Sequence, residues 1–160
     1  MTREERVTAR QFHRRVNHES GLLGISETSS DMKELLELEP HDSPAAEAVA
    51  MFCYQTKKWV CALAGALEGL DTLIFAGGIG ERSPEIRARI CRGLEFIGFR
   101  LDAARNNAHA PIISGDAIPA TVRVIRTDEA LIIAKTVCRL LGFGMKEGKS
   151  NENQREDDCK

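Results

Sequence analysis

Residues 71–81 have the sequence DTLIFAGGIGE, in which a short apolar stretch runs directly into a glycine-rich segment that ends on a carboxylate. The apolar stretch predicts a buried strand, and Ser83-Pro84 predicts the start of a helix. Between them, Gly77, Gly78 and Gly80 are expected to supply positive φ angles and close approach of the backbone. A strand, a tight turn and a helix in this order indicate an α/β fold, and such a turn is suited to holding a nucleotide.

The glycine segment differs from the two best-known phosphate-binding loops. It lacks the lysine-containing end of a Walker A loop, and it lacks the third glycine and the later acidic residue of a dinucleotide fingerprint. The carboxylate of Glu81 would repel phosphates unless a metal intervened. We therefore expect the turn to face a base or a ribose rather than a triphosphate, with a purely structural turn as the alternative.

Apolar spacing predicts helices on both sides of this segment. They cover residues 2–16, 32–38, 43–69, 83–97 and 127–141. The first of these helices has few apolar positions to bury, whereas the longest is apolar around much of its circumference and should be central. Further short strands are predicted at 111–113 and 121–125.

The predicted elements combine into a three-layer α/β arrangement, with parallel strands joined through the 83–97 helix. The chain has 160 residues, of which 42% are hydrophobic, and this is enough to fill one core. The predicted strands are few for a sheet covered on both faces, so we expect an incomplete sheet in an incomplete chain. Residues 145–160 are polar almost throughout, which predicts a disordered tail.

Composition narrows the class of ligand. A formal net charge of -2 argues against nucleic acid or an anionic membrane as the main partner. No apolar segment approaches the roughly 20 residues that span a bilayer, and the N-terminus has no signal-peptide core, so a cytoplasmic location is expected. The five cysteines form no CxxC pair, and the four histidines, His109 among them, lie in polar stretches and are expected to be solvated.

Three ordered motifs resemble the acetate kinase family. They are NHESGLLGISETSSDMKEL at 17–35, IFAGGIGERSPEIR at 74–87 and VIRTDEALIIA at 124–134. The resemblance implies a two-lobed actin-like fold with ribonuclease-H-like sheets. It identifies residues 17–144 with part of the C-terminal lobe, after a polar N-terminal helix at 1–16. It also implies Mg2+-dependent phosphoryl transfer between ATP and acetate, which gives acetyl phosphate and ADP, and a homodimer formed through the C-terminal lobe.

The resemblance implies nucleotide contacts in the glycine turn. The matching positions are Gly78, Ile79, Gly80, Glu81, Arg82 and Ile86. The family usually has asparagine where this chain has Arg82, so a stacking guanidinium would replace a polar contact to the base. From the residues alone, Ile86 is read as a core side chain, and the resemblance makes the core and pocket readings equally favoured.

A second nucleotide-bordering segment is implied at Asp31, Met32 and Lys33, where the family commonly has Asp-Met-Arg. Lysine keeps the positive charge but loses the planar fork of arginine. The alternative for Asp31 is a helix N-cap worth about 1 kcal/mol, in a D-x-x-E box with Glu34.

Glu129 matches a glutamate that the family associates with magnesium. Glu129 and Asp128 could instead be partners of the helix dipole, worth about 0.3 to 1 kcal/mol each, and we interpret Asp128 as a cap. In the family, the acetate pocket, the catalytic arginines and the phosphate-binding segment precede the matched part, so no catalytic residue is assigned in this chain. It is expected to carry the adenosine side of the cleft and to be inactive alone. The alternatives are a non-catalytic nucleotide-binding or dimerisation module, and a remnant of a truncated gene.

Overall fold

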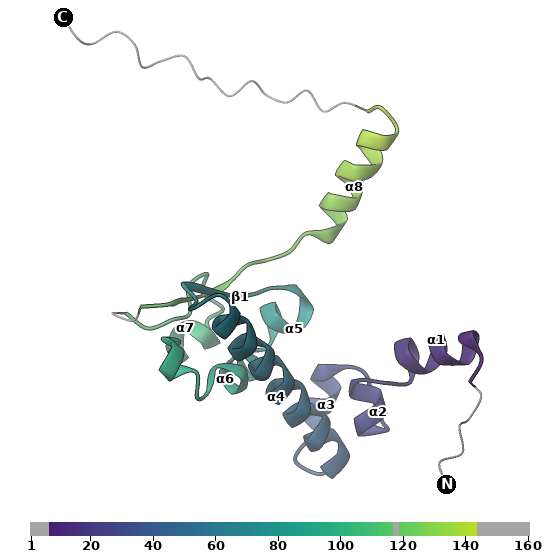
Figure 1. Ribbon diagram of the computed structural model, residues 1–160, viewed down its shortest axis with the longest axis horizontal. Helices are drawn as coiled ribbons and strands as arrows, with labels where there is room; N and C mark the ends of the chain where they lie inside the picture. Colours follow the sequence, from purple (N-terminus) through teal and green to yellow (C-terminus); the bar gives the residue numbers. More distant parts are fainter. Residues whose placement is uncertain (1–6, 117–118, 144–160) are drawn as a thin grey trace, which may run out of the picture. The chain divides into compact units, whose positions relative to one another are not determined.

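Two short parallel strands, β1 (Thr72–Phe75) and β2 (Thr121–Val124), pair in the computed structural model, which describes residues 7–116 and 119–143. Thr72 lies opposite Thr121, and the register continues to Phe75 opposite Val124. The parallel pairing confirms the prediction for these two segments. Because parallel strands need a crossover, the chain between them carries helices (Figure 1).

The strand predicted at 111–113 does not form. In its place, Ile112 makes an isolated antiparallel bridge with Arg123, and Leu101 makes another with Ser114. The segment makes two backbone hydrogen bonds with β2: the N–H of Ile113 donates to the carbonyl oxygen of Val122 at 2.9 Å, and the carbonyl oxygen of Pro111 accepts from the N–H of Val124 at 3.0 Å.

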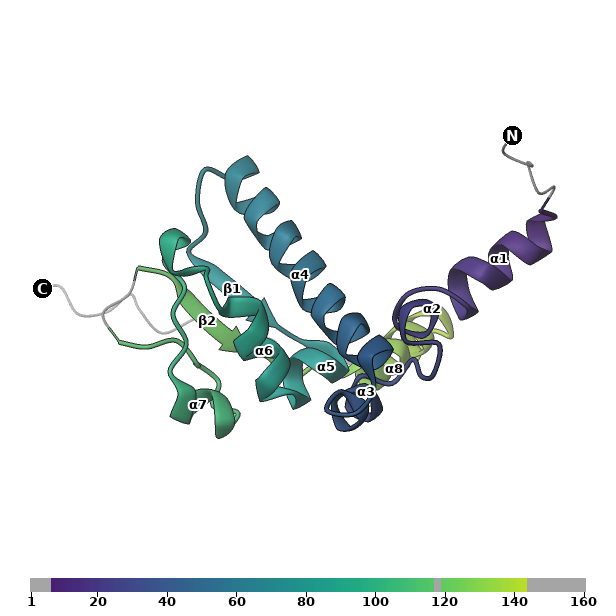
Figure 2. The same cartoon turned by 90° about the horizontal axis from the view of Figure 1, so that it is seen from below.

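The sheet has one buried face and one exposed face. Phe75 and Val122 are buried, and both belong to the hydrophobic core. On the opposite face, Ile74 is 51% exposed, and its partner Arg123 is exposed as well. Within the described residues around the sheet, helices cover one face, with α4 and α6 near the strands in Figure 2. Residues 7–116 and 119–126 therefore form two layers around the sheet, and the three-layer arrangement, which included the helix predicted at 127–141, stays a prediction.

The chain divides into two compact units, residues 1–126 and 127–160. The helices of the first unit are α1 (Ala9–His18), α2 (Leu22–Ser26), α3 (Met32–Leu38), α4 (Ser43–Ala66), α5 (Gly77–Arg82), α6 (Pro84–Cys91) and α7 (Ala103–Asn107), with a 3-10 turn at Glu95–Ile97. The second unit contains α8 (Glu129–Leu140). No helix in the described ranges is both long and apolar enough to cross a membrane. The predicted tail at 145–160 lies outside the described residues.

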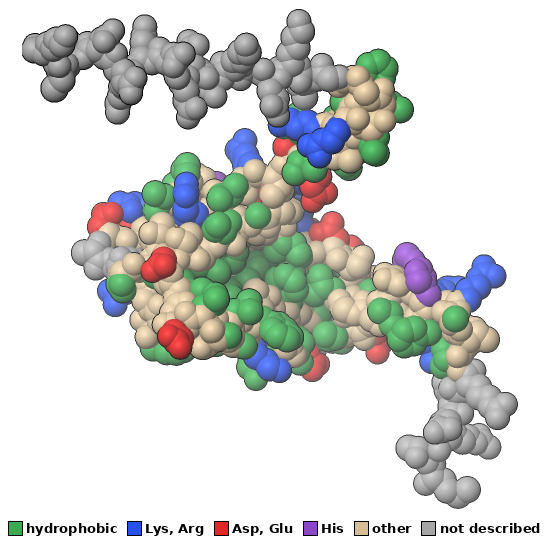
Figure 3. Space-filling view, turned by 45° about the horizontal axis from the view of Figure 1, so that its top comes forward, with side chains coloured by type: hydrophobic (Ala, Val, Ile, Leu, Met, Phe, Trp, Pro, Cys, Tyr) green, Lys and Arg blue, Asp and Glu red, His purple; other side chains and the backbone are tan. Residues whose placement is uncertain are grey.

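Helix α4 begins as the sequence predicts. Asp42 caps it by accepting a hydrogen bond from the backbone N–H of Ala45, and Pro44 occupies its first turn. The helix buries its small residues and leaves large apolar ones exposed: Trp59, Leu63 and Leu67 are at least half exposed. Figure 3 shows hydrophobic side chains gathered in a hollow on the face that it draws. Among the described residues one side of α4 is thus exposed, so the expectation of a central helix is not met there.

Two other helices differ from expectation. The helix predicted at 83–97 ends at Cys91, because Gly93 takes a φ of 82° and a 3-10 turn follows. Leu94 is nevertheless fully buried, so the apolar spacing marks the core correctly but not the helix. Helix α8, which belongs to the second unit, has no buried residue within that unit among those described, and the broad packed face expected for it stays a prediction.

Candidate functional site

The glycine segment forms a short helix, α5, directly after the end of β1. Of its glycines only Gly77 has a positive φ, at 71°. Gly80 is needed for close approach, since a Cβ there would lie 3.3 Å from the backbone carbonyl carbon of Phe75. A Cβ at Gly78 would meet nothing within 4 Å, so this position faces open space. The expectation that all three glycines adopt positive φ is therefore corrected.

The carboxylate of Glu81 turns back into α5. Its Oε1 accepts a hydrogen bond of 2.9 Å from the backbone N–H of Gly77. A carboxylate at this position favours the positive end of the helix dipole. The carboxylate also takes the N–H of Gly77, which could otherwise bind an anionic ligand. This agrees with the expectation that the turn faces a base or a ribose.

The opposite end of α5 is held by Arg87 of α6, whose side chain is fully buried (0% exposed). Its Nη1 donates to the carbonyl oxygens of Gly80 at 2.8 Å and Glu81 at 3.0 Å. Its Nε and Nη2 donate to the side-chain Oδ1 and the carbonyl oxygen of Asn106, at 2.7 Å and 2.8 Å. Burial lowers the pKa of the guanidinium from its ordinary value.

His109 also contacts this end of α5. Its Nδ1 lies 3.0 Å from the carbonyl oxygen of Glu81 and 3.5 Å from Nη2 of Arg87. A carbonyl oxygen only accepts, so the contact with Glu81 is a hydrogen bond in the tautomer that carries its proton on Nδ1. The side chain is exposed as expected, but it is not merely solvated.

Sequence reasoning missed Arg87, Asn106 and His109 as neighbours of the turn. One signal was present for Arg87: it is a charged residue between Ile86 and Ile90, within the apolar repeat of α6. Asn106 and His109 are about 20 or more positions further along the chain, in α7 and just after it, and no local pattern links them to the turn.

At the start of α3, the structure shows the capping role of Asp31. Its side chain accepts a hydrogen bond of 2.8 Å from the backbone N–H of Lys33. Glu34 instead accepts a hydrogen bond of 2.5 Å from the hydroxyl of Ser29, so the predicted D-x-x-E box does not close. The Lys33 side chain is exposed and lies 4.0 Å from Glu37.

Part of the two predicted nucleotide segments lies in one hydrophobic core. Met32 and Ile86 are both buried members of it, and Ile79 packs against it. Ile86 is only 1% exposed, which favours its reading as a core side chain. Gly78 and Arg82 are exposed, so these are the turn residues that offer surface to a ligand.

Glu129 is the first residue of α8, in the second unit, and it is exposed. Asp128 caps this helix by accepting a hydrogen bond of 2.8 Å from the N–H of Leu131, which confirms its reading as a cap. Among the described residues no three His, Cys, Asp or Glu side chains are grouped to hold a metal. Mg2+ is commonly bound by one or two carboxylates together with waters and substrate phosphates, and a single exposed glutamate fits that pattern.

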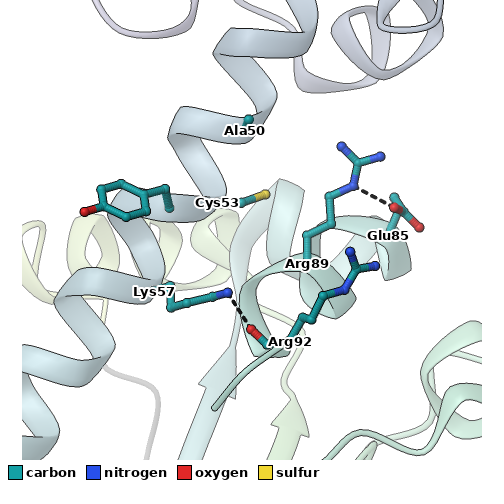
Figure 4. A pocket seen from close by; sticks show the side chains of 7 residues that line it. Ala50, Cys53, Lys57, Glu85, Arg89 and Arg92 are labelled. Atoms are coloured by element: carbon teal, nitrogen blue, oxygen red, sulfur yellow. Dashed lines mark hydrogen bonds and ion pairs between the residues drawn. The ribbon is translucent and has the colours of Figure 1, made fainter.

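A cavity of about 390 Å³ lies between α4 and α6, away from the glycine turn (Figure 4). Its lining residues are Ala50, Cys53, Tyr54, Lys57, Glu85, Arg89 and Arg92. Arg89 is paired with Glu85 and Glu39, and Lys57 donates to the carbonyl oxygen of Arg92. Burial raises the pKa of the Cys53 thiol. Two of the lining cations, Arg89 and Lys57, thus already have partners.

Comparison with known proteins decides the family. The profile of the acetokinase family matches residues 1–135. The chain belongs to the acetokinase family. The acetate kinase of Phocaeicola vulgatus is 42% identical over 129 residues, which cover 79% of this chain and 32% of that enzyme. The propionate kinase of Citrobacter rodentium is 37% identical over 141 residues, which cover 88% of this chain and 35% of that enzyme.

Solved structures agree with this acetokinase assignment. The crystal structure of Porphyromonas gingivalis acetate kinase superposes with a TM-score of 0.74 at 34% identity, and the match covers 84% of this chain and 35% of that chain. A propionate kinase from Francisella tularensis gives a TM-score of 0.72 at 33% identity. The chain therefore spans about a third of the length of the acetokinase relatives it matches.

Proposed function

We propose that this chain forms the adenosine-binding side of an acetate kinase active site. The observation that carries the proposal is the geometry of α5, a glycine helix with open space over Gly78 and both ends held by hydrogen bonds. Gly78, Ile79, Gly80 and Glu81 would border the ribose and base through their backbone, because the Glu81 carboxylate itself is engaged with Gly77.

Other residues have narrower roles in the proposed site. The exposed guanidinium of Arg82 would stack on the adenine ring. Asp31, Met32 and Lys33 would border the nucleotide from α3, while Ile86 would support the turn from the core beneath it. Glu129 would supply one carboxylate oxygen to the Mg2+ of the bound nucleotide. When bound, that ion would neutralise charge on the phosphates during transfer.

The whole reaction, transfer of a phosphoryl group between ATP and acetate, requires more than this chain in our proposal. Phosphoryl transfer depends on cations that are positioned around the transferring group. We place those groups, together with the acetate pocket, in the part of the enzyme that this chain does not span. A ribonuclease-H-like lobe, a homodimer formed through that lobe and a cytoplasmic location belong to the same proposal.

The limited coverage favours a second candidate, a non-catalytic nucleotide-binding or dimerisation module. A chain that spans 32% of an acetate kinase can keep the adenosine turn without the transfer machinery. A truncated gene remnant would keep the sequence without binding at all. Nucleotide binding by the purified chain separates the remnant from the other two.

Calorimetric titration of the chain with Mg-ADP tests the proposal, with Gly78→Val as the variant. A valine side chain there meets no protein atom within 4 Å of its Cβ, so it would fill ligand space without a clash in the chain. We expect the wild type to bind and Gly78→Val to lose binding while its circular dichroism stays unchanged. Absence of binding by a folded wild type would overturn the proposal.

A further inference from the structure

We infer that Arg87 is a positioning residue for the glycine turn. This inference rests on the proposed function of α5 as the adenosine-binding element. Arg87 lies beneath the turn, is fully buried and has no surface to offer a ligand. Its effect on a nucleotide is therefore exerted through the backbone of Gly80 and Glu81, which it holds in place.

The hydrogen-bond geometry leaves Arg87 little freedom. A guanidinium has five N–H donors in a rigid fork. Both donors of Nη1 are used on the carbonyl oxygens of Gly80 and Glu81, and Nε and Nη2 each donate to Asn106. These acceptors belong to two separate elements, α5 and α7, so the fork ties both to α6 at a fixed spacing.

Asn106 fixes the orientation of the fork. Its side chain is 3% exposed, and its Nδ2 donates to the carbonyl oxygen of Pro84 at 2.8 Å. That bond assigns Oδ1 as the acceptor of the Arg87 Nε, since the amide offers one oxygen and one nitrogen. The start of α6, the end of α7 and the end of α5 are thus connected through two buried side chains.

Helix α5 needs this support because of its own composition. It has six residues, three of which are glycine. Glycine is a poor helix former, and a single turn is far below the length at which an isolated helix is stable. The carbonyl groups in the last turn of a helix lack partners within the helix, and Arg87 supplies donors to two of them.

The same contacts explain why a cation is tolerated at zero exposure. A buried charge is costly unless its hydrogen-bonding groups are satisfied. The carbonyl end of a helix carries partial negative charge, which favours a guanidinium there. Burial lowers the pKa of Arg87, yet an arginine remains protonated at neutral pH. The charge and the fork are thus both retained beneath the turn.

The test compares Arg87→Ala with Arg89→Ala in the full chain. Arg89 lies on the same helix and pairs with Glu39 and Glu85 rather than with α5, so it controls for loss of an arginine from α6. We expect Arg87→Ala to weaken Mg-ADP binding by about tenfold or more, as loss of charged hydrogen bonds predicts, and Arg89→Ala to bind like the wild type. Ethylguanidinium at millimolar concentration should fill the cavity in Arg87→Ala and restore binding, which a variant with general damage would not show.

Hydrogen exchange of the backbone amides of residues 81–83 provides a readout that needs no nucleotide. These amides should exchange faster in Arg87→Ala than in Arg89→Ala, while amides in the middle of α4 should stay protected in both. If the wild type does not bind Mg-ADP, the proposed function fails, and the exchange comparison still decides the role of Arg87. Equal exchange at 81–83 in the two variants would overturn the inference.

Arg87→Lys provides a second test in case Arg87→Ala does not fold. Lysine keeps the positive charge and most of the bulk but cannot span α5 and α7 with a planar fork. We expect native circular dichroism with faster exchange at residues 81–83, and weaker binding that ethylguanidinium does not restore because no cavity is left. Wild-type exchange and affinity in Arg87→Lys would contradict the role of the fork.

Discussion

Gly77, Gly78 and Gly80 lie within four positions of one another, and each is glycine for a different reason. Gly77 takes a positive φ at the start of α5, Gly80 approaches the backbone of Phe75, and Gly78 faces open space. The sequence showed that the turn needs glycines but could not separate these roles. A φ angle depends on where the helix begins, and a close approach depends on the packing of α5 against β1.

Two alanine substitutions would separate these roles. Gly77→Ala should lower the free energy of unfolding by about 1 to 2 kcal/mol, because alanine is strained at positive φ. Gly78→Ala should leave it unchanged or raise it by up to about 1 kcal/mol, because alanine favours helical φ and its Cβ meets no atom within 4 Å. Urea unfolding of both variants measures the difference. Equal destabilisation would contradict the φ assignment.

Cys91 shows how burial controls a side chain that the sequence left without a role. Burial, with Glu95 nearby, raises the pKa of its thiol to about 12, so at pH 8 roughly one molecule in 10⁴ carries the thiolate. We expect Cys91 to react with iodoacetamide far more slowly than the half-buried Cys61 at pH 8. Peptide mass spectrometry after timed labelling measures both rates. Equal rates would show that Cys91 is not buried in solution.

At the scale of elements, helix starts were predictable and helix ends were less so. Asp31 and Asp128 cap their helices and α6 begins at the predicted Ser83-Pro84, because a helix start depends on residues within about three positions. The end of α6 was missed because Leu94 continues its apolar spacing from a 3-10 turn. Burial and helical conformation are separate properties, and a periodic pattern reports the first more reliably.

Among the residues that the structure describes, strand β1 pairs along one edge only, and its hydrogen bonds show which edge is left free. The carbonyl oxygen of Asp71 accepts a hydrogen bond from the N–H of Thr121, and that of Phe75 accepts one from the N–H of Ile125. Successive residues of a strand point their backbone groups to opposite sides, so the groups of Ile74 face away from β2. Natural sheets usually cover or block such an edge.

Proline substitutions in β1 test this assignment. Ile74→Pro removes an N–H on the free edge, whereas Leu73→Pro removes one directed at β2. Relative to alanine at the same position, we expect the penalty for proline to be larger at 73 than at 74 by about 1 kcal/mol, the worth of one ladder hydrogen bond. Thermal unfolding of the four variants provides the comparison. A larger penalty at 74 would reverse the assignment of the edge.

At the scale of the whole molecule, the family could be predicted from three motifs, but the exposure of the long helix could not. The apolar residues around much of α4 predicted a central helix, yet Trp59 is 64% exposed. Apolar spacing indicates that a surface is suited to packing, but it does not show which other segment covers that surface. The buried polar contacts of Arg87 escaped prediction for another reason, since they join residues distant in sequence.

Catalytic activity is also a property of the whole molecule. The purified chain should form no acetyl phosphate from ATP and acetate, because we place the groups around the transferring phosphoryl elsewhere. Co-expression with the part of the Phocaeicola vulgatus enzyme that precedes the matched segment should restore turnover, measured as acyl hydroxamate. In the restored enzyme, Glu129→Gln should raise the Mg2+ requirement and lower the rate. Asp128→Asn is the matched control, because asparagine also caps helices.

Turnover by the chain alone would contradict this division of the active site. An unchanged Mg2+ requirement in the Glu129→Gln enzyme would contradict the role of Glu129 in metal binding.

The parallel pairing of β1 with β2 has a consequence for how the protein is made. Thr121 follows Thr72, its partner, by 49 positions, and all of α5, α6 and α7 lie between them. At a synthesis rate of about 5–20 residues per second, β1 leaves the ribosome roughly 2 to 10 s before the strand that pairs with it. During that interval both edges of β1 are open. The nascent chain therefore has a window of seconds in which chaperone binding or strand pairing with another molecule competes with native folding.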